Sequence, residues 1–150
     1  MDFDLPADLI AYLEELDAFI EKEIKPLENE GDNIKYFDHR REYERTDWAK
    51  GGLPKKEWED LLAEARRRAD KAGHLRFSWP RDLGGKEGSQ LWLAVIREHL
   101  AAKGLGLHND LQNEHSIVSN NPFVVMFKEF ATPEQYARDA QKLLDSAMRT

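Results

Sequence analysis

The sequence predicts an all-α fold: one domain over residues 1–150, built as a helical bundle of about six helices. Apolar residues recur at steps of three or four along most of the chain, which is the spacing of one helix face. Prolines and glycines separate these periodic stretches. No stretch alternates apolar and polar residues convincingly, as a half-buried strand would, so we expect no strand.

The first helix begins after Asp4 and Pro6 and is expected to end at Pro26. Its buried stripe consists of Leu9, Leu13, Leu16 and Ile20. From residue 29 to residue 52 the chain becomes charged and aromatic without a clear period. We therefore expect an irregular excursion at 29–52, with one short helical turn around residues 37–43.

A second helix is predicted to open at Leu53-Pro54, because proline at the first helical position loses no internal hydrogen bond. Gly73 is its expected C-terminal cap. Its buried stripe consists of Trp58, Leu61, Leu62, Ala65, Ala69 and Ala72. We expect Trp58, Leu61 and Leu62 to pack against the stripe of the first helix.

The segment 74–89 combines large aromatic residues with glycines, which predicts an ordered loop anchored by Trp79. Ser89 can cap a third helix that runs to about Gly104. Its apolar positions are Leu91, Val95, Ile96 and Leu100. Further helices are expected at 107–118 and 122–130, and the last helix starts at a capping box of Thr132 and Gln135.

Charge and composition narrow the classes of function. The formal net charge of −7 disfavours binding to phosphate backbones. Arg66, Arg67 and Arg68 lie among acidic residues at helical spacing, so we interpret this basic run as a salt-bridged helix face. The chain has no cysteine, and no stretch approaches the ~20 apolar residues of a membrane span. We expect a cytoplasmic protein with neither nucleic acid nor membrane as partner.

Amides and histidines interleave with apolar residues between Gly104 and Pro122. These polar residues are His108, Asn109, Gln112, Asn113, His115, Asn120 and Asn121. Such a helix either bonds neighbouring loops through its polar side or forms the wall of a ligand pocket. A metal site of His108, Asp110, Glu114 and His115 is a further alternative, but we assign no metal ligand and no catalytic residue from the sequence.

Several short motifs follow one another along nearly the whole chain. They are Leu5-Pro6-Ala7-Asp8-Leu9, Ile24-Lys25-Pro26, Trp79-Pro80 with Leu83-Gly84-Gly85, and Phe130-Ala131-Thr132-Pro133-Glu134-Gln135. Their order and spacing resemble those of the N-terminal helical domain of flavin-dependent acyl-CoA dehydrogenases. The insertion at 29–52 departs from that pattern, and so does Ala131, where the family usually has glycine.

The resemblance implies part of an enzyme that dehydrogenates an acyl-CoA thioester between its α and β carbons, in lipid or sterol catabolism. Its cofactor would be FAD and its electron acceptor electron-transfer flavoprotein. In the family, a middle β-domain and a C-terminal helical domain complete the flavin site and supply the catalytic glutamate. Leu111, Gln112, Asn113, Glu114 and His115 would lie nearest to the substrate.

By the same resemblance, we expect this chain alone to be inactive and not to bind FAD tightly, because one wall of a pocket buries too little of a ligand. The alternative belongs to another class of protein. In that interpretation the chain is a non-catalytic helical interaction module that docks on separately encoded domains.

Overall fold

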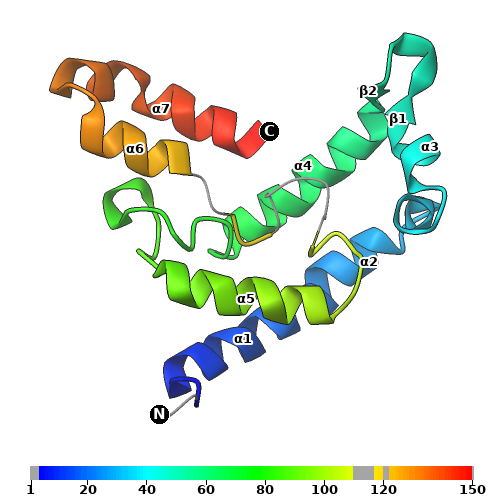
Figure 1. The fold of residues 1–150 in the computed structure, drawn as a ribbon, viewed down its shortest axis with the longest axis horizontal. Coiled ribbons are helices and arrows are strands. Elements are labelled where there is room, and N and C mark those ends of the chain that lie inside the picture. Colours follow the sequence, from blue (N-terminus) through cyan, green and yellow to red (C-terminus); the bar gives the residue numbers. More distant parts are fainter. Residues whose placement is uncertain (1–3, 110–116, 120–121, 150) are drawn as a thin grey trace.

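The computed structural model describes residues 4–109, 117–119 and 122–149, and these residues are mostly helical (Figure 1). The long helices are α1 (Ala7–Phe19), α4 (Lys56–Lys71), α5 (Gln90–Ala102), α6 (Pro122–Phe130) and α7 (Pro133–Arg149). The shorter elements are η1 (Ile20–Ile24), α2 (Lys25–Glu28), η2 (Asn33–Phe37), α3 (Arg41–Arg45), β1 (Thr46–Asp47), η3 (Trp48–Lys50), β2 (Leu53–Pro54) and η4 (Arg81–Leu83). The predicted all-α class is confirmed, although β1 and β2 form one short antiparallel pair that we did not expect.

The first helix does not end at Pro26, contrary to the prediction. α1 continues through a π-helical turn, η1, into α2, which ends at Glu28. In this turn the backbone N–H of Lys25 donates to the carbonyl of Ile20, five residues back. Pro26 therefore lies in the first turn of a new α-helical segment, where its missing N–H costs no hydrogen bond. The apolar period alone gave no sign of this change in hydrogen-bond register.

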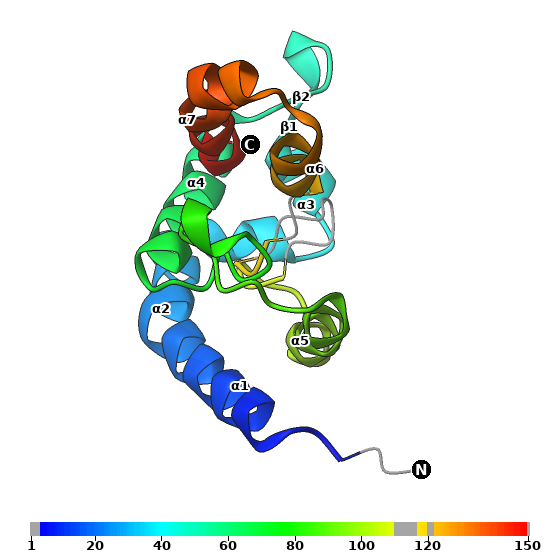
Figure 2. The ribbon, with the colours of Figure 1, turned by 90° about the vertical axis from the view of Figure 1, so that its left-hand side faces the viewer.

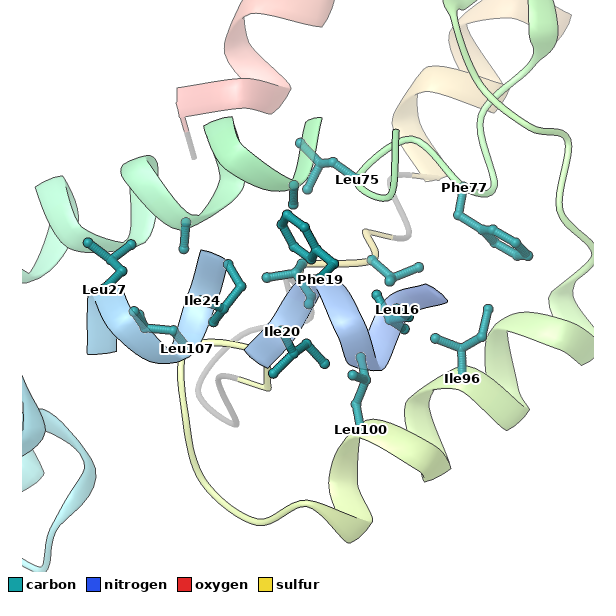
Figure 3. Packing of buried hydrophobic residues seen from close by; sticks show 14 of the residues in the cluster. Leu16, Phe19, Ile20, Ile24, Leu27, Leu75, Phe77, Ile96, Leu100 and Leu107 are labelled. Carbon is teal, nitrogen blue, oxygen red and sulfur yellow. The ribbon is translucent and has the colours of Figure 1, made fainter. Parts of the chain in front are cut away.

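The main core lies between this long helix and its neighbours α4 and α5 (Figure 3). The predicted stripe of Leu9, Leu13, Leu16 and Ile20 is buried. In Figure 3, Leu16 and Ile20 lie opposite Ile96 and Leu100 of α5. The stripe of the first helix is thus confirmed, and α5 covers part of it.

The stripe predicted for α5 is wrong at its first position. Leu91 is 74 % exposed, whereas Leu93 is buried. With Ile96 and Leu100, Leu93 forms the inward face at steps of three and four residues, which leaves Leu91 on the other side of the helix. The predicted cap is present, because the backbone N–H of Trp92 donates to Oγ of Ser89 at 3.1 Å.

α4 begins at Lys56, two residues after the predicted opening, because Leu53 and Pro54 form β2. The predicted stripe is buried at Trp58, Leu61, Leu62, Ala65 and Ala69. Ala72 is exposed, because the helix has already ended at Lys71. Gly73 then adopts a left-handed backbone with φ of 82°, which confirms it as the C-terminal cap.

Two residues of the basic run on α4 form the salt bridges that the spacing predicted. Arg67 and Arg68 both pair with Glu64, and Arg68 also donates to the backbone carbonyl of Glu23 at 2.8 Å. Arg66 is buried. This face of α4 therefore stabilises the fold, and the hydrogen bond from Arg68 connects α4 to η1.

The excursion at 29–52 is packed against α4 rather than irregular throughout. The ring centroids of Tyr36 and Phe37 lie 5.2 Å and 5.8 Å from that of Trp58. The Arg45 guanidinium lies 3.9 Å from the centroid of the Trp58 ring, and its Nε donates to the carbonyl of Tyr36 at 2.9 Å. Trp58 also belongs to the same core cluster as the stripe of the first helix, and its aromatic and cation–π contacts come from η2 and α3.

The loop at 74–89, called the glycine loop below, is packed as predicted, and Trp79 is only 1 % exposed. A Cβ atom at Gly85 would overlap the carbonyl oxygen of Trp79, and one at Gly88 would overlap the Phe77 ring. Glycine is therefore required at both positions for the chain to approach its own aromatic anchors this closely.

The C-terminal helices are confirmed in the described residues. Thr132 and Gln135 form the predicted capping box: the Thr132 N–H donates to Oε1 of Gln135 at 2.9 Å, and the Gln135 N–H donates to Oγ1 of Thr132 at 3.2 Å. The helix predicted at 107–118 does not begin at Leu107, because residues 106–109 form a turn closed by a bridge between Gly106 and Asn109. Residues 110–116 lie outside the described residues.

α6 and α7 pack against each other, and α7 also contacts α4 (Figure 1). The hairpin of β1 and β2 lies at the end of the molecule farthest from the N-terminus, as Figures 1 and 2 both show. None of the helices in the described part of the chain is long and apolar enough to cross a membrane.

We expect the Trp58→Ala variant to lose about 3–5 kcal/mol of unfolding free energy, because it leaves a cavity between α4, Tyr36 and Phe37. Urea unfolding followed by circular dichroism measures this loss. Phe130→Ala is the matched control, because Phe130 is 82 % exposed, and its effect should stay within about 0.5 kcal/mol. Equal stability of the two variants would contradict the packing described for Trp58.

Candidate functional site

A cleft of about 580 Å³ lies between α1, the glycine loop and the start of α5. Its lining combines aromatic and acidic side chains with a single lysine. The lining residues are Asp8, Ala11, Tyr12, Glu15, Phe77, Lys86, Glu87, Gly88, Ser89 and Trp92. We call this the acidic cleft, because Asp8, Glu15 and Glu87 outnumber Lys86.

Behind the cleft, the Tyr12 hydroxyl is hydrogen bonded to Nδ1 of His74 at 3.2 Å. The end of α4 places His74 there: the N–H of His74 donates to the carbonyl of Ala69 and that of Gly73 to the carbonyl of Asp70, both at 2.9 Å. These two bonds are those of a Schellman motif, which reverses the chain after a helix. This reversal of the chain after α4 places the His74 side chain in the core, in contact with α1.

Burial lowers the pKa of His74 below its usual value, the Lys86 ammonium lowers it further, and Glu15 acts in the opposite direction. Burial also raises the pKa of the Tyr12 hydroxyl, and Glu15 adds to that shift. Both side chains are therefore neutral at pH 7. His74 is 1 % exposed, so it supports the wall of the cleft and does not meet a ligand directly.

The open part of the acidic cleft has side chains that can bind a cation. The Lys86 ammonium lies 4.9 Å from the centroid of the Tyr12 ring, which shows that this wall accepts a cation over an aromatic face. Glu15 Oε1 lies 3.9 Å from Nε2 of His74. With Asp8 and Glu87 on the lining, the cleft favours a ligand that is both apolar and positively charged.

A second polar cluster is buried at the end of α2. Oε2 of Glu28 accepts the backbone N–H of Leu107 at 2.9 Å, and Oε1 lies 3.3 Å from the Lys25 ammonium. His108 is fully buried in the same turn, and a Cβ atom at Gly106 would lie 2.5 Å from Oε2 of Glu28 and 2.7 Å from the His108 ring. Glu28 therefore fastens the turn that follows α5 onto the first helix.

Burial lowers the pKa of His108 below its usual value. The ammonium of Lys25 and, more weakly, that of Lys103 lower it further, whereas Glu28 and the Gly104 carbonyl raise it. The balance keeps His108 neutral in the folded protein. The sequence alone did not single out Glu28, because its partner Leu107 is 79 residues away and contributes only a backbone group.

The residues expected nearest to a substrate, Leu111, Gln112, Asn113, Glu114 and His115, all lie outside the described residues. The segment is flanked by buried residues: Leu107 and His108 before it, and Ile117, Val118 and Ser119 after it. The N–H of Ser119 donates to the carbonyl of Leu75 at 3.1 Å, and Oγ of Ser78 donates to the carbonyl of Ser119 at 3.2 Å. Both flanks are thus fastened to the core.

Of the four residues in the alternative metal site, the structure describes only His108. Over residues 4–109, 117–119 and 122–149, no three histidine, aspartate or glutamate side chains come together in a group that could hold a metal ion.

No protein-family model, no curated protein and no solved structure matches this chain. The resemblance to acyl-CoA dehydrogenases therefore rests on the motifs of the sequence itself.

The buried histidines make stability depend on pH. The folded-state pKa values of His74 and His108 lie below the ordinary value of about 6.5, so the unfolded chain takes up more protons as the pH falls below 6.5. Unfolding free energy should therefore decrease from pH 7 to pH 5.5, with a slope of up to about 1.4 kcal/mol per pH unit for each histidine. Urea unfolding at several pH values measures the slope.

In the same measurement, His74→Gln and His108→Gln should each reduce the slope, because each removes one buried group that titrates. His39→Gln is the control, since His39 is exposed. A slope that neither core variant changes would contradict the assignment to these two histidines.

We expect Glu28→Ala to cost about 1–3 kcal/mol of unfolding free energy, because it leaves the buried N–H of Leu107 without an acceptor. Hydrogen exchange at the Leu107 amide should become faster in this variant. Glu28→Gln keeps an acceptor oxygen and should retain more of the protection. Glu30→Ala, at an exposed position two residues further on, serves as the matched control and should change neither quantity.

Proposed function

We propose that this chain is the N-terminal helical domain of an FAD-dependent acyl-CoA dehydrogenase. In this proposal the complete enzyme removes two hydrogens from the α and β carbons of an acyl-CoA thioester and passes the electrons to electron-transfer flavoprotein. The chain contributes one wall of the acyl and flavin pocket, through Leu111 to His115, and has no activity alone.

The observation that carries the proposal is an uncovered apolar face on α6. Phe123, Met126 and Phe130 are 68 %, 53 % and 82 % exposed. Their spacing of three and four residues places them on one side of the helix. They line a groove of about 390 Å³ between α6 and α7. Contiguous apolar surface of this kind marks a site where another domain or chain docks.

This face argues against a module that works without any partner, because such a module would be expected to bury its apolar side chains and to carry charge on all sides. A non-catalytic module that docks on separately encoded domains would also leave an apolar face, so the test of activity below separates it from part of an enzyme. A domain that packs against further domains of its own enzyme leaves an apolar face where they meet it. The remaining dehydrogenase domains are therefore the proposed partners of α6.

Two motifs of the resemblance have the local structure that they need. Gly85 allows the chain to approach the Trp79 carbonyl, and Thr132 with Gln135 caps the helix that begins at Pro133. Both motifs agree with the proposal, but they do not distinguish this family from others, because glycine loops and capping boxes occur in many folds.

We assign FAD and the catalytic base to the remaining domains. The described clefts of this chain are lined by charged and aromatic groups on its own surface, and one wall buries too little of a flavin for tight binding. Hydride transfer also requires a flavin held against the β carbon and a base placed against the α proton. The part played by this chain is to shape and to close the pocket.

The experiment compares residues 1–150 alone with the same chain joined to the middle β-domain and C-terminal helical domain of an acyl-CoA dehydrogenase. The isolated chain with added FAD should not reduce an acceptor dye with any acyl-CoA. The extended protein should purify with flavin absorbance and lose it on anaerobic mixing with its substrate. Turnover by the isolated chain would overturn the proposal, and so would an extended protein that binds flavin but reacts with no acyl-CoA.

Variants of the extended protein test the two roles separately. Replacing Phe123 and Phe130 by serine should weaken docking of the domains and reduce bound flavin, because the apolar face loses its contacts. Leu91→Ser is the control at an exposed leucine outside this face. Changes at Gln112 or Asn113 should instead raise the KM for acyl-CoA with flavin content unchanged.

A further inference from the structure

A groove of about 620 Å³ lies where α4 meets the end of the first helix, and Figure 3 shows Phe19 between these two helices. It is lined by Ala18, Phe19, Lys22 and Glu23 on the first helix and by Glu64, Arg67, Arg68, Lys71 and Ala72 on and just after α4. Four of these residues are cationic and two are acidic, so the lining has a formal charge of +2. We call this the basic groove.

Ion pairs within the chain do not consume this charge. Arg67 and Arg68 both pair with Glu64, so one carboxylate serves two guanidinium groups and one positive charge is left over. Lys22 and Lys71 are exposed, and neither forms an ion pair with any residue that the structure describes. When the carboxylate of Glu23 is also counted, the groove keeps its excess of two positive charges.

The Arg68 guanidinium is held in place before any ligand binds. Its Nε donates to Oε1 of Glu64 at 2.7 Å, and its Nη1 donates to the carbonyl of Glu23 at 2.8 Å. Burial raises the pKa of the Glu64 carboxyl, but the hydrogen bonds from Arg68 and Arg67 lower it by more, so this carboxylate is charged at pH 7. Nη2 of Arg68 makes no hydrogen bond to the described residues. A fixed guanidinium with unused donors can bind an anion with little loss of side-chain freedom.

Cations in the last turn of a helix can also serve only to offset the negative end of the helix dipole. At the end of α4, the carbonyls of Arg68, Ala69 and Asp70 already accept backbone N–H groups of the turn that follows. The side chains of Arg68 and Lys71 are therefore not needed to satisfy these carbonyls.

The charge and the size of the basic groove fit a phosphate monoester. Such an ester carries a charge of about −1.5 to −2 at pH 7 and has three strong acceptor oxygens. The groove volume lies in the range that proteins use for compact ligands. Ala18, Ala72 and the aliphatic parts of the two lysines provide apolar surface for the organic part of the ester. A long polyanion is disfavoured, because the whole chain has a charge of −7.

We propose that the basic groove binds a small phosphate monoester with an apolar organic part. Arg67 and Arg68 donate to the phosphate oxygens through the N–H groups that Glu64 leaves unused, and Lys22 and Lys71 flank the phosphate from the two helices. This inference is independent of the proposed enzyme, because it uses neither the segment from Leu111 to His115 nor any other domain.

Titration of phenyl phosphate into residues 1–150, followed by isothermal titration calorimetry and phosphorus NMR, tests the proposal. We expect saturable binding with a Kd below about 1 mM at low ionic strength, and a Kd that rises with added salt. Lys22→Ala combined with Lys71→Ala should raise the Kd roughly tenfold or more, because two charge-assisted contacts are lost. Arg68→Lys should also raise the Kd, since lysine keeps the charge but lacks the planar fork of donors.

The matched control combines Lys50→Ala with Lys142→Ala. It removes the same charge from two exposed lysines outside the groove and should leave the Kd nearly unchanged. Circular dichroism checks that each variant is folded. Absence of phenyl phosphate binding at low ionic strength would overturn the proposal, and so would an equal loss of affinity in the two double variants, because net charge alone would then explain it. A chain that binds vesicles containing phosphatidic acid but not phenyl phosphate would contradict it as well, because the ligand would then be a lipid headgroup.

Discussion

Burial of one apolar stripe, from Leu9 to Leu27 along the first helix, is the constraint on which the rest of the structure depends. Leu16, Ile20 and Ile24 are completely buried, and α5 and α4 both pack against this helix. Polar groups of the same helix fix its neighbours: Tyr12 bonds to His74 in the glycine loop, and Glu28 bonds to the turn after α5. A single helix thus supplies both the apolar contacts and the hydrogen bonds that orient the surrounding loops.

The features that the sequence predicted correctly have local causes. Gly73, the Ser89 cap and the Thr132 capping box depend on residues within a few positions of each other, so a short window contains the whole signal. The predictions that are wrong, at Pro26, Leu53 and Leu91, depend on hydrogen bonding and packing that a short stretch of sequence does not contain. Pro26 is tolerated because a π turn precedes it, and Leu53 pairs as a strand with a segment that showed no period. Leu91 was assigned to the wrong side because two helix phases fit the leucines of α5 almost equally well.

The candidate site was harder to predict than the fold. Tyr12 and His74 are 62 residues apart, and no local pattern relates a helical tyrosine to a histidine after a glycine cap. The acidic cleft likewise combines α1 with the glycine loop and α5, and its acidic residues look like ordinary surface charge in the sequence. The residues that the resemblance implies to be nearest to a substrate, Leu111 to His115, lie outside the described part of the chain. Tertiary contacts, rather than residue types, define what this surface can bind.

The π-helical turn at Ile20–Ile24 has a consequence for how the first helix can vary. A turn whose hydrogen bonds join residues five apart holds one residue more than an α-helical turn. Loss of one residue within this turn would therefore restore ordinary α-helical bonding, and the residues on either side of it would keep their faces. Leu27 would stay in the core and Glu28 would still face the Leu107 amide. Each residue of a regular α-helix advances the chain by about 100° around the axis, so the same deletion within α1 would rotate everything after it by about that angle. The first helix therefore tolerates a change in length at this turn better than anywhere else along its buried stripe.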